Sequence, residues 1–106
     1  MTIQEQIRIA ENRTKLFDIL TSISNYYVLT VEEVFENSRD IDVMEARQVF
    51  IGICHLKLNF NQTEIARMIG ISQPHAHRGM VIFFEDLEDD LETKEIYNEI
   101  ITTFDL

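Results

Sequence analysis

The segment from residue 62 to residue 81, QTEIARMIGISQPHAHRGMV, constrains the fold of this chain more than any other part. Gly70 separates two amphipathic stretches, and glycine readily takes the left-handed backbone conformation that ends a helix. Ser72 can cap a second helix, and Pro74 then fits its first turn, where the missing N–H loses no hydrogen bond. The segment therefore predicts two short helices joined by a three-residue turn, a helix-turn-helix.

Small and branched side chains fall where two such helices pack closely. Ala66 supplies a small residue at the crossing. Three isoleucines are expected to fill the angle between the helices: Ile65, Ile69 and Ile71. In the second helix, Ala76 and Gly79 occupy sites where a larger aliphatic residue usually packs. Met80 and Phe83 are therefore expected to complete the core beneath that helix.

Turn-forming residues are scarce in the rest of the chain. The 106 residues contain three glycines and one proline, too few for the many short connections of an all-β fold. We therefore expect an all-α fold with about six helices around the helix-turn-helix. Since one hydrophobic core serves a chain of this length, residues 1–106 are expected to form a single helical domain.

Capping patterns indicate where helices begin. Three pairs have the spacing in which a short polar side chain and an acid three residues later satisfy the first free N–H groups: Thr30 with Glu33, Asp42 with Glu45, and Asn61 with Glu64. A helix over residues 3–24 is expected to turn these residues inward: Ile3, Ile7, Ala10, Phe17, Leu20 and either Ser24 or Ile23. A helix over residues 43–58 carries a wide apolar stripe, and Gly52 allows a neighbour to approach it closely. This helix is expected to form the centre of the core.

The C-terminal part, residues 85–106, is predicted to be an acidic helical tail. The helix capped by Ser72 is expected to run to about Asp90, and Thr93 is expected to start the last helix. The apolar side of that last helix contains four residues: Ile96, Ile100, Ile101 and Phe104.

Reactive side chains form no catalytic or metal-binding pattern. Cys54 lies in an apolar run and is expected to be a buried thiol, which fits a reducing, cytoplasmic setting. His55 is expected at the edge of the core with one nitrogen satisfied. His75 and His77 are two apart on a helix and point to different sides, so they cannot chelate a metal ion. We expect no enzyme activity, no metal, no other cofactor and, without a long apolar stretch, no membrane span.

Charge is distributed unevenly along the chain. Nineteen acidic residues against nine basic residues give a formal net charge of −10, which ordinarily disfavours a polyanionic partner such as DNA. Residues 85–106 hold nine of these acids and one lysine, a formal charge of −8. In the helix-turn-helix, by contrast, Glu64 is outnumbered by Arg67 and Arg78. The face of the helix-turn-helix is therefore expected to be near neutral or weakly positive.

The second helix of the motif presents side chains suited to reading DNA. Four remain outside near its N-terminus once the inward residues are assigned: Gln73, His75, His77 and Arg78. Glutamine can bond adenine at two atoms and arginine can do the same with guanine. Gln62, Ser72 and the free N–H groups at the helix start can hold phosphates. We expect this helix to enter the major groove of double-stranded DNA; the plain alternative is a tight helical corner without a ligand.

Several strings of the sequence together resemble a known family. They are Tyr26-Tyr27, LTVEEVF at 29–35, Ser38-Arg39, Glu45-Ala46-Arg47-Gln48-Val49 and EIARMIG at 64–70. The family is the C-terminal DNA-binding domain of the bacterial replication initiator DnaA, a member of the Trp-repressor-like group. The resemblance covers most of the chain and implies a Trp-repressor-like arrangement. It also adds Arg39 and Arg47 to the residues expected to contact DNA.

The sequence departs from that family in three places. The family follows its Ser-Arg pair with more basic residues, whereas Asp40-Ile41-Asp42 follows Arg39 here. The family's Gly-Arg-Asp-His-Ser/Thr-Thr run after the turn is replaced by ISQPHAHR at 71–78. The ATPase module of an initiator and its Gly-rich phosphate-binding loop do not occur.

Two functions from different classes follow. The first is a small DNA-binding regulator of transcription or replication. With few cations it would bind specific sites as a homodimer, through the tail helix, or beside a protein partner on DNA. The second is an acidic protein-interaction module, such as a phage-type inhibitor that imitates DNA toward a basic protein. In that case the acidic residues in 85–92 would bind the partner protein. The ordinary role of such a run is to keep an exposed helix face soluble.

Overall fold

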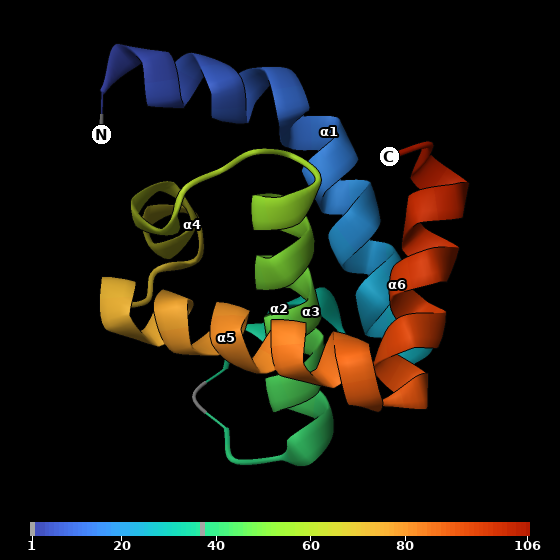
Figure 1. Cartoon of the computed structure of the whole chain (residues 1–106). Coiled ribbons are helices and arrows are strands. Elements are labelled where there is room, and N and C mark those ends of the chain that lie inside the picture. Colours follow the sequence, from blue (N-terminus) through green and yellow to red (C-terminus); the bar gives the residue numbers. More distant parts are fainter. Residues whose placement is uncertain (1, 37) are drawn as a thin grey trace.

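Six α-helices and no strand occur in residues 2–36 and 38–106, which the computed structural model describes. The helices are α1 (Ile3–Tyr26), α2 (Val31–Val34), α3 (Ile41–Leu56), α4 (Gln62–Ile69), α5 (Gln73–Asp89) and α6 (Leu91–Phe104). In Figure 1, α5 crosses α3 at a steep angle, while α6 runs beside the second half of α1. The predicted all-α fold with about six helices is confirmed.

The central helix is α3, which contacts each of the other five helices. Its side chains Val49, Ile53 and Cys54 are at most 2% exposed. At Gly52 the ring of Phe83, from α5, lies directly against the backbone, and a Cβ atom there would lie 2.1 Å from Cδ2 of the ring. The prediction that Gly52 admits a close neighbour is therefore confirmed. This contact fixes how α5 crosses the core helix.

Capping side chains start the short helices as predicted. At α2, Thr30 accepts from the Glu33 N–H while the Glu33 side chain accepts from the Thr30 N–H. Asn61 and Glu64 form the same reciprocal pair at α4. Both predicted capping boxes are thus confirmed.

Two predicted helix starts are wrong because an upstream aspartate takes the free N–H groups first. α3 begins at Ile41, where Asp40 accepts from the N–H groups of Asp42 and Val43, so Asp42 lies inside the helix. α6 begins at Leu91, where Asp90 accepts from both the N–H and the hydroxyl of Thr93. Asp90 also ends α5, so the two helices of the acidic tail meet at one residue.

The first half of α1 does not bury the predicted face. Ile3 and Ile7 are 75% and 51% exposed, and Phe17, in the second half, is also exposed at 59%. All the buried side chains come from the second half, where the predicted Leu20, Ile23 and Ser24 are joined by Leu16 and Ile19. The reason is that α1 bends in Figure 1, so its first part lies over α4 and away from the apolar core. Ion pairs of Glu5 and Arg8, together with the partly buried Ile9, hold that part in place.

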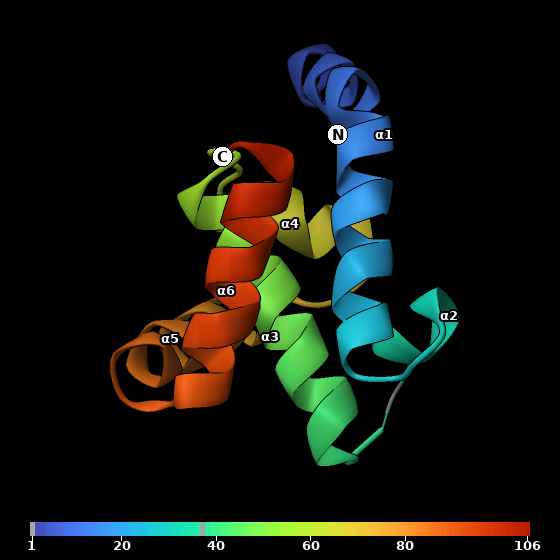
Figure 2. The same cartoon turned by 90° about the vertical axis from the view of Figure 1, so that its right-hand side faces the viewer.

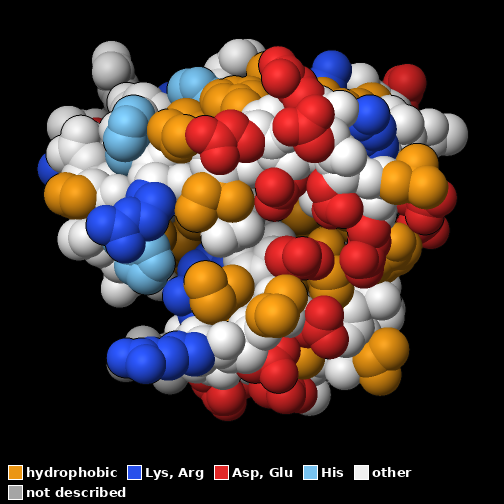
Figure 3. Space-filling view, turned by 60° about the horizontal axis from the view of Figure 1, so that its bottom comes forward, with side chains coloured by type: hydrophobic (Ala, Val, Ile, Leu, Met, Phe, Trp, Pro, Cys, Tyr) orange, Lys and Arg blue, Asp and Glu red, His pale blue; other side chains and the backbone are white. Residues whose placement is uncertain are grey.

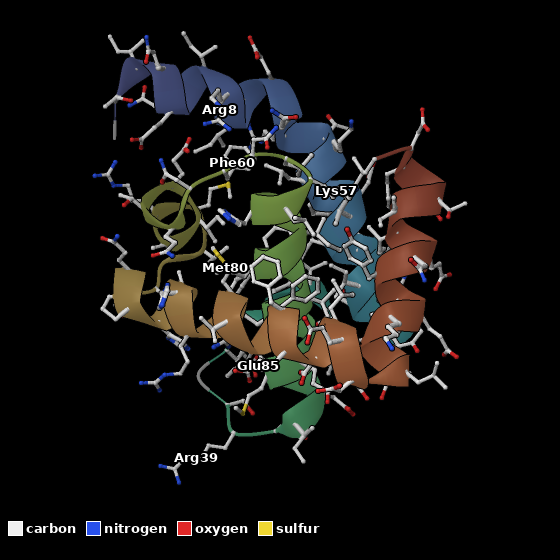
Figure 4. All side chains as sticks on the ribbon, in the orientation of Figure 1. Arg8, Arg39, Lys57, Phe60, Met80 and Glu85 are labelled. Carbon is white, nitrogen blue, oxygen red and sulfur yellow. The ribbon has the colours of Figure 1, made fainter. Side chains whose placement is uncertain are left out.

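Arg8 connects the first part of α1 to the start of α4. Its Nη1 lies 2.9 and 2.7 Å from the two carboxylate oxygens of Glu64, which is only 2% exposed. Its Nη2 donates to the carbonyl of Asn59 at 2.8 Å. The guanidinium also lies 4.7 Å from the centre of the Phe60 ring, toward which Figure 4 shows it reaching. No local sequence pattern indicates this contact, because its partners are 56 residues apart.

The last helix, α6, packs its apolar side into the same core. Ile96 and Ile100 are each 1% exposed, and α6 contacts α1, α3 and α5. In Figure 2, α6 lies alongside α1 with α3 behind the pair. Ile96 and Ile100, on the apolar side of α6, are therefore covered within this chain. No helix among the described residues combines the length and the hydropathy needed to cross a membrane.

Candidate nucleic-acid interface

A three-residue turn, residues 70–72, joins α4 to α5. Gly70 ends α4 in the left-handed conformation, with φ 71° and ψ 35°, and Ile71 donates its N–H to the Ala66 carbonyl at 3.0 Å. Ser72 then caps α5, its Oγ accepting from the His75 N–H at 3.2 Å. Pro74 lies in the first turn of α5. The helix boundaries predicted from Gly70, Ser72 and Pro74 are confirmed.

The inward side of this helix pair is a packed core. Ile65 and Ala76 are completely buried, and Ala66 is 5% exposed. Met80 and Phe83 are 4% and 1% exposed and complete the core beneath α5, as predicted. Figure 4 shows Met80 rising from α5 toward α4. One side of the first half of α5 is therefore packed against the core, and its other side is open to solvent.

The open side of α5 carries the four predicted reading side chains in two rows. Gln73 and His77, four residues apart, form the row nearer α4. His75 and Arg78, three residues apart, border a hollow of about 110 Å³ together with residues of α3. All four side chains are exposed. We call these four residues and Ser72 the reading face.

Gln62 of α4 reaches across to the reading face. Its amide nitrogen lies 2.7 Å from Nδ1 of His77. Because an amide nitrogen can only donate, Nδ1 of His77 accepts, and the neutral ring carries its proton on Nε2. Gln62 and His77 had been predicted separately, and their contact was not predicted, since it depends on the angle between the helices. The contact leaves His77 with a donor directed away from Gln62.

The N-terminus of α5 offers fewer free donors than expected. His75 donates its N–H to the Ser72 hydroxyl, and Ala76 donates to the Ser72 carbonyl at 3.0 Å. Pro74 has no N–H. Within the described chain, the N–H of Gln73 is therefore the first-turn donor left for a phosphate.

The two arginines added by the family resemblance differ in their surroundings. Arg39 is exposed, and Figure 4 shows it extending from the loop before α3, away from the body of the molecule. Arg47 is 8% exposed; its Nε donates to the Val34 carbonyl at 3.0 Å and its Nη2 to the Glu36 carbonyl. Arg47 thus holds the end of α2 against α3, and it also borders the hollow beside His75 and Arg78. The sequence contains no local pattern that pairs it with those carbonyls.

Charges of opposite sign gather at the two ends of α5. Figure 3 shows histidine and arginine side chains toward one side of the molecule and carboxylates toward the other. Four carboxylates from three helices and their junction define what we call the acidic face: Glu45, Asp86, Asp90 and Glu92. Burial raises the pKa of Glu45, and the negative charges of Glu92, Asp90 and Asp86 raise it further. Burial and Asp90 likewise raise the pKa of Asp86.

Replacing Glu45 by glutamine is expected to stabilise the protein at pH 7 by a few tenths of a kcal/mol, as is typical of removing a like-charge contact at a surface. The fold raises the pKa of Glu45 above its ordinary value of 4.5, so ionisation weakens the folded state as pH rises through this range. The gain should therefore be present at pH 7 and nearly absent at pH 4. Urea unfolding at both pH values measures it, with Glu88→Gln on the exposed side of α5 as the control. Equal gains at both pH values would contradict this account.

Cys54 and His55, the other reactive side chains singled out in the sequence, lie in or at the edge of the core. Cys54 is fully buried, and burial raises the pKa of its thiol. His55 is partly buried with Nδ1 2.9 Å from the Phe60 carbonyl, as expected for a core-edge histidine. In residues 2–36 and 38–106, no group of three or more His, Cys, Asp or Glu side chains could hold a metal ion. Neither a family model nor a curated protein matches this chain.

Proposed function

We propose that this chain is a small DNA-binding protein that places the first half of α5 in the major groove of double-stranded DNA. The observation that carries this proposal is the reading face: polar and basic side chains exposed on one side of a helix whose other side is fixed in the core. An α-helix is about 10–12 Å wide, which suits a major groove about 12 Å wide. The three-residue turn holds α4 beside α5, as a helix-turn-helix requires.

Three side chains of the reading face, together with Arg39, have specific roles in this proposal. Arg78 donates two N–H groups to O6 and N7 of a guanine, and Gln73 bonds an adenine at two atoms. The Nε2–H of His77 donates to a phosphate or a base acceptor, with its ring oriented by Gln62. Arg39 reaches a phosphate beside the groove. The remaining acids of the chain make binding weak and sensitive to salt.

The family resemblance supports the same proposal. The matching strings include the segment EIARMIG, which forms α4, and the Tyr26-Tyr27 pair at the end of α1. We propose on this basis a Trp-repressor-like arrangement and a role in regulating transcription or replication. Because ISQPHAHR replaces the family's recognition run, the site read by α5 differs from an initiator's site.

Replacing Arg78 by alanine is expected to weaken DNA binding roughly ten-fold, the loss typical of one base-contacting arginine. The measurement is fluorescence anisotropy of a labelled pool of random-sequence duplexes at low salt. Lys94→Ala is the matched control, because it removes one positive charge from the exposed surface of α6, outside the reading face. Wild type should bind at low micromolar concentration and Lys94→Ala should match it. Absence of binding by wild type, or equal weakening by both variants, would contradict the proposal.

A second candidate function rests on the acidic face. Besides burial, the negative charges of neighbouring side chains raise the pKa of Glu45 on α3 and of Asp86 on α5, so a basic protein bound to that face would relieve this repulsion. The chain would then act as an acidic interaction module that imitates DNA. Affinity capture from nuclease-treated lysate distinguishes the two functions. If a captured partner protein no longer binds the Glu92→Gln variant but still binds Arg78→Ala, the chain acts as an acidic interaction module.

A further inference from the structure

An apolar groove, which shares no residue with the reading face, lies between α1 and α4. It consists of two adjoining hollows of about 230 and 370 Å³, both bordered by Ile9, Arg13 and Met68. One hollow extends to Phe35, after α2, and to Phe50 of α3. We call the two hollows together the α1–α4 groove.

The walls of the α1–α4 groove expose large apolar side chains to solvent. Phe17 is 59% exposed and Phe35 is 36% exposed. Met68 and Ile69 of α4 are half-buried beside them. Contiguous apolar surface with a polar rim marks a place where another molecule binds. Met68 adds a flexible, polarisable side chain that adapts to different apolar partners.

The charge of the groove is opposite to that of the whole chain. Its ionic lining side chains are Arg13 and Arg67, and no carboxylate borders either hollow. Arg67 is positioned by Glu5, whose carboxylate oxygen lies 2.7 Å from its Nη1. Because Glu5 compensates Arg67, Arg13 supplies the net positive charge beside the apolar walls, and this charge favours an acidic partner.

We propose that the α1–α4 groove binds an acidic amphipathic helix of a partner protein. Apolar side chains of that helix would lie against Phe17, Phe35 and Met68, and its flanking carboxylates would pair with Arg13 and Arg67. The groove follows α1 from residue 6 to residue 20, a distance of about 21 Å at 1.5 Å per residue. Because α1 bends, the direct span of the groove is shorter than this contour length, and a partner helix of at most about four turns fits it, in the manner of helix-in-groove recognition.

The structure favours a partner protein over a second copy of this chain. The acidic helices of the chain are α5 and α6, and their apolar sides are already buried at Phe83, Ile96 and Ile100. A second copy would therefore present these two helices with their main apolar sides already packed, leaving Val81, Phe84 and Leu91 as their large exposed apolar side chains in the described residues. Since the groove and the reading face share no residue, a partner helix and DNA can bind at the same time.

Two synthetic helical peptides of about 14 residues test the proposal. They share leucine and phenylalanine on one side and differ only in carrying glutamate or lysine on the flanks. The glutamate peptide should bind the full chain at micromolar concentration, and the lysine peptide at least ten-fold more weakly. Arg13→Glu should reverse this preference. Phe17→Ser should weaken binding of the glutamate peptide while leaving the thermal midpoint near that of wild type, because the side chain is 59% exposed.

Three results would overturn the proposal. They are equal affinity for the two peptides, no binding of the glutamate peptide at high micromolar concentration, and an unchanged preference in Arg13→Glu. A fourth contradicting result would come from sedimentation velocity. If the wild type is a dimer and Phe17→Ser is a monomer, the groove binds a second copy of the chain. Arg78→Ala should leave peptide binding unchanged, so failure of this proposal is distinguishable from failure of DNA binding.

Discussion

Replacing Gly52 by alanine is expected to destabilise the protein by about 3 kcal/mol, at the upper end of the range for overpacked cores. The new Cβ would lie 2.1, 2.3 and 2.5 Å from three atoms of the Phe83 ring. That ring is 1% exposed and packed against Phe84 and Tyr97, so it has no open space to enter. The helix preference of alanine over glycine returns only about 1 kcal/mol. α5 must therefore move away from α3.

Thermal unfolding measures this effect, and a loss of about 3 kcal/mol lowers the midpoint by roughly 12 °C or more in a domain of this size. Gly79→Ala is the matched control, because its nearest contact is the flexible end of Ile51 at 2.9 Å. That control should stay within about 1 kcal/mol of wild type. Phe83→Leu should partly rescue Gly52→Ala. A wild-type midpoint for Gly52→Ala would show that Phe83 does not pack on Gly52.

Replacing Arg8 by alanine is expected to destabilise the protein by about 2–3 kcal/mol, somewhat less than for a fully buried pair because the Arg8 side chain is 39% exposed. The change leaves the Glu64 carboxylate buried with the Asn61 N–H as its remaining partner. It also removes the donor to the Asn59 carbonyl and the contact with the Phe60 ring. The first part of α1 should then detach from α4, which amide hydrogen exchange would show as faster exchange.

Arg67→Ala provides a control with the same chemistry at a more exposed site. Arg67 also joins α4 to α1, and its distance to Glu5 is the same 2.7 Å as that of Arg8 to Glu64. The side chains of that pair are 44% and 19% exposed, so its loss should change stability by less than about 1 kcal/mol. Equal losses for Arg8→Ala and Arg67→Ala would contradict the role given to burial. Adding Glu64→Gln to Arg8→Ala should recover part of the loss, since the unpaired charge is removed.

Local sequence patterns predicted the helix pair well because its determinants are local. A glycine that must take a positive φ, a capping serine and a proline in the first turn act within a few residues of one another. The exposed positions of α5 follow from the same boundaries. The α2 and α4 capping boxes are predictable for the same reason, since each involves residues three apart.

Features that depend on how helices cross could not be predicted from the sequence. Ile3 and Ile7 have helical spacing with Leu20, yet the bend of α1 leaves both isoleucines exposed while Leu20 is buried. Arg47 is a basic residue of a type that often contacts DNA. Its Nε and Nη2 donate to backbone carbonyls at the end of α2, which only the packing of α2 against α3 reveals. The sequence predicted a close neighbour for Gly52, but the identity of that neighbour required the crossing of α5. The same crossing determines that Gln62 meets His77.

DNA binding to the reading face can be followed residue by residue through amide chemical shifts measured by NMR. A random-sequence duplex is titrated into the labelled protein at low salt while every backbone amide is followed. We expect the largest shifts in the first half of α5, between Ser72 and Arg78, with smaller shifts at Gln62 and Arg39. Amides of α6 should remain unmoved. Absence of shifts at saturating DNA, or the largest shifts on the acidic face, would show that DNA does not bind to the reading face.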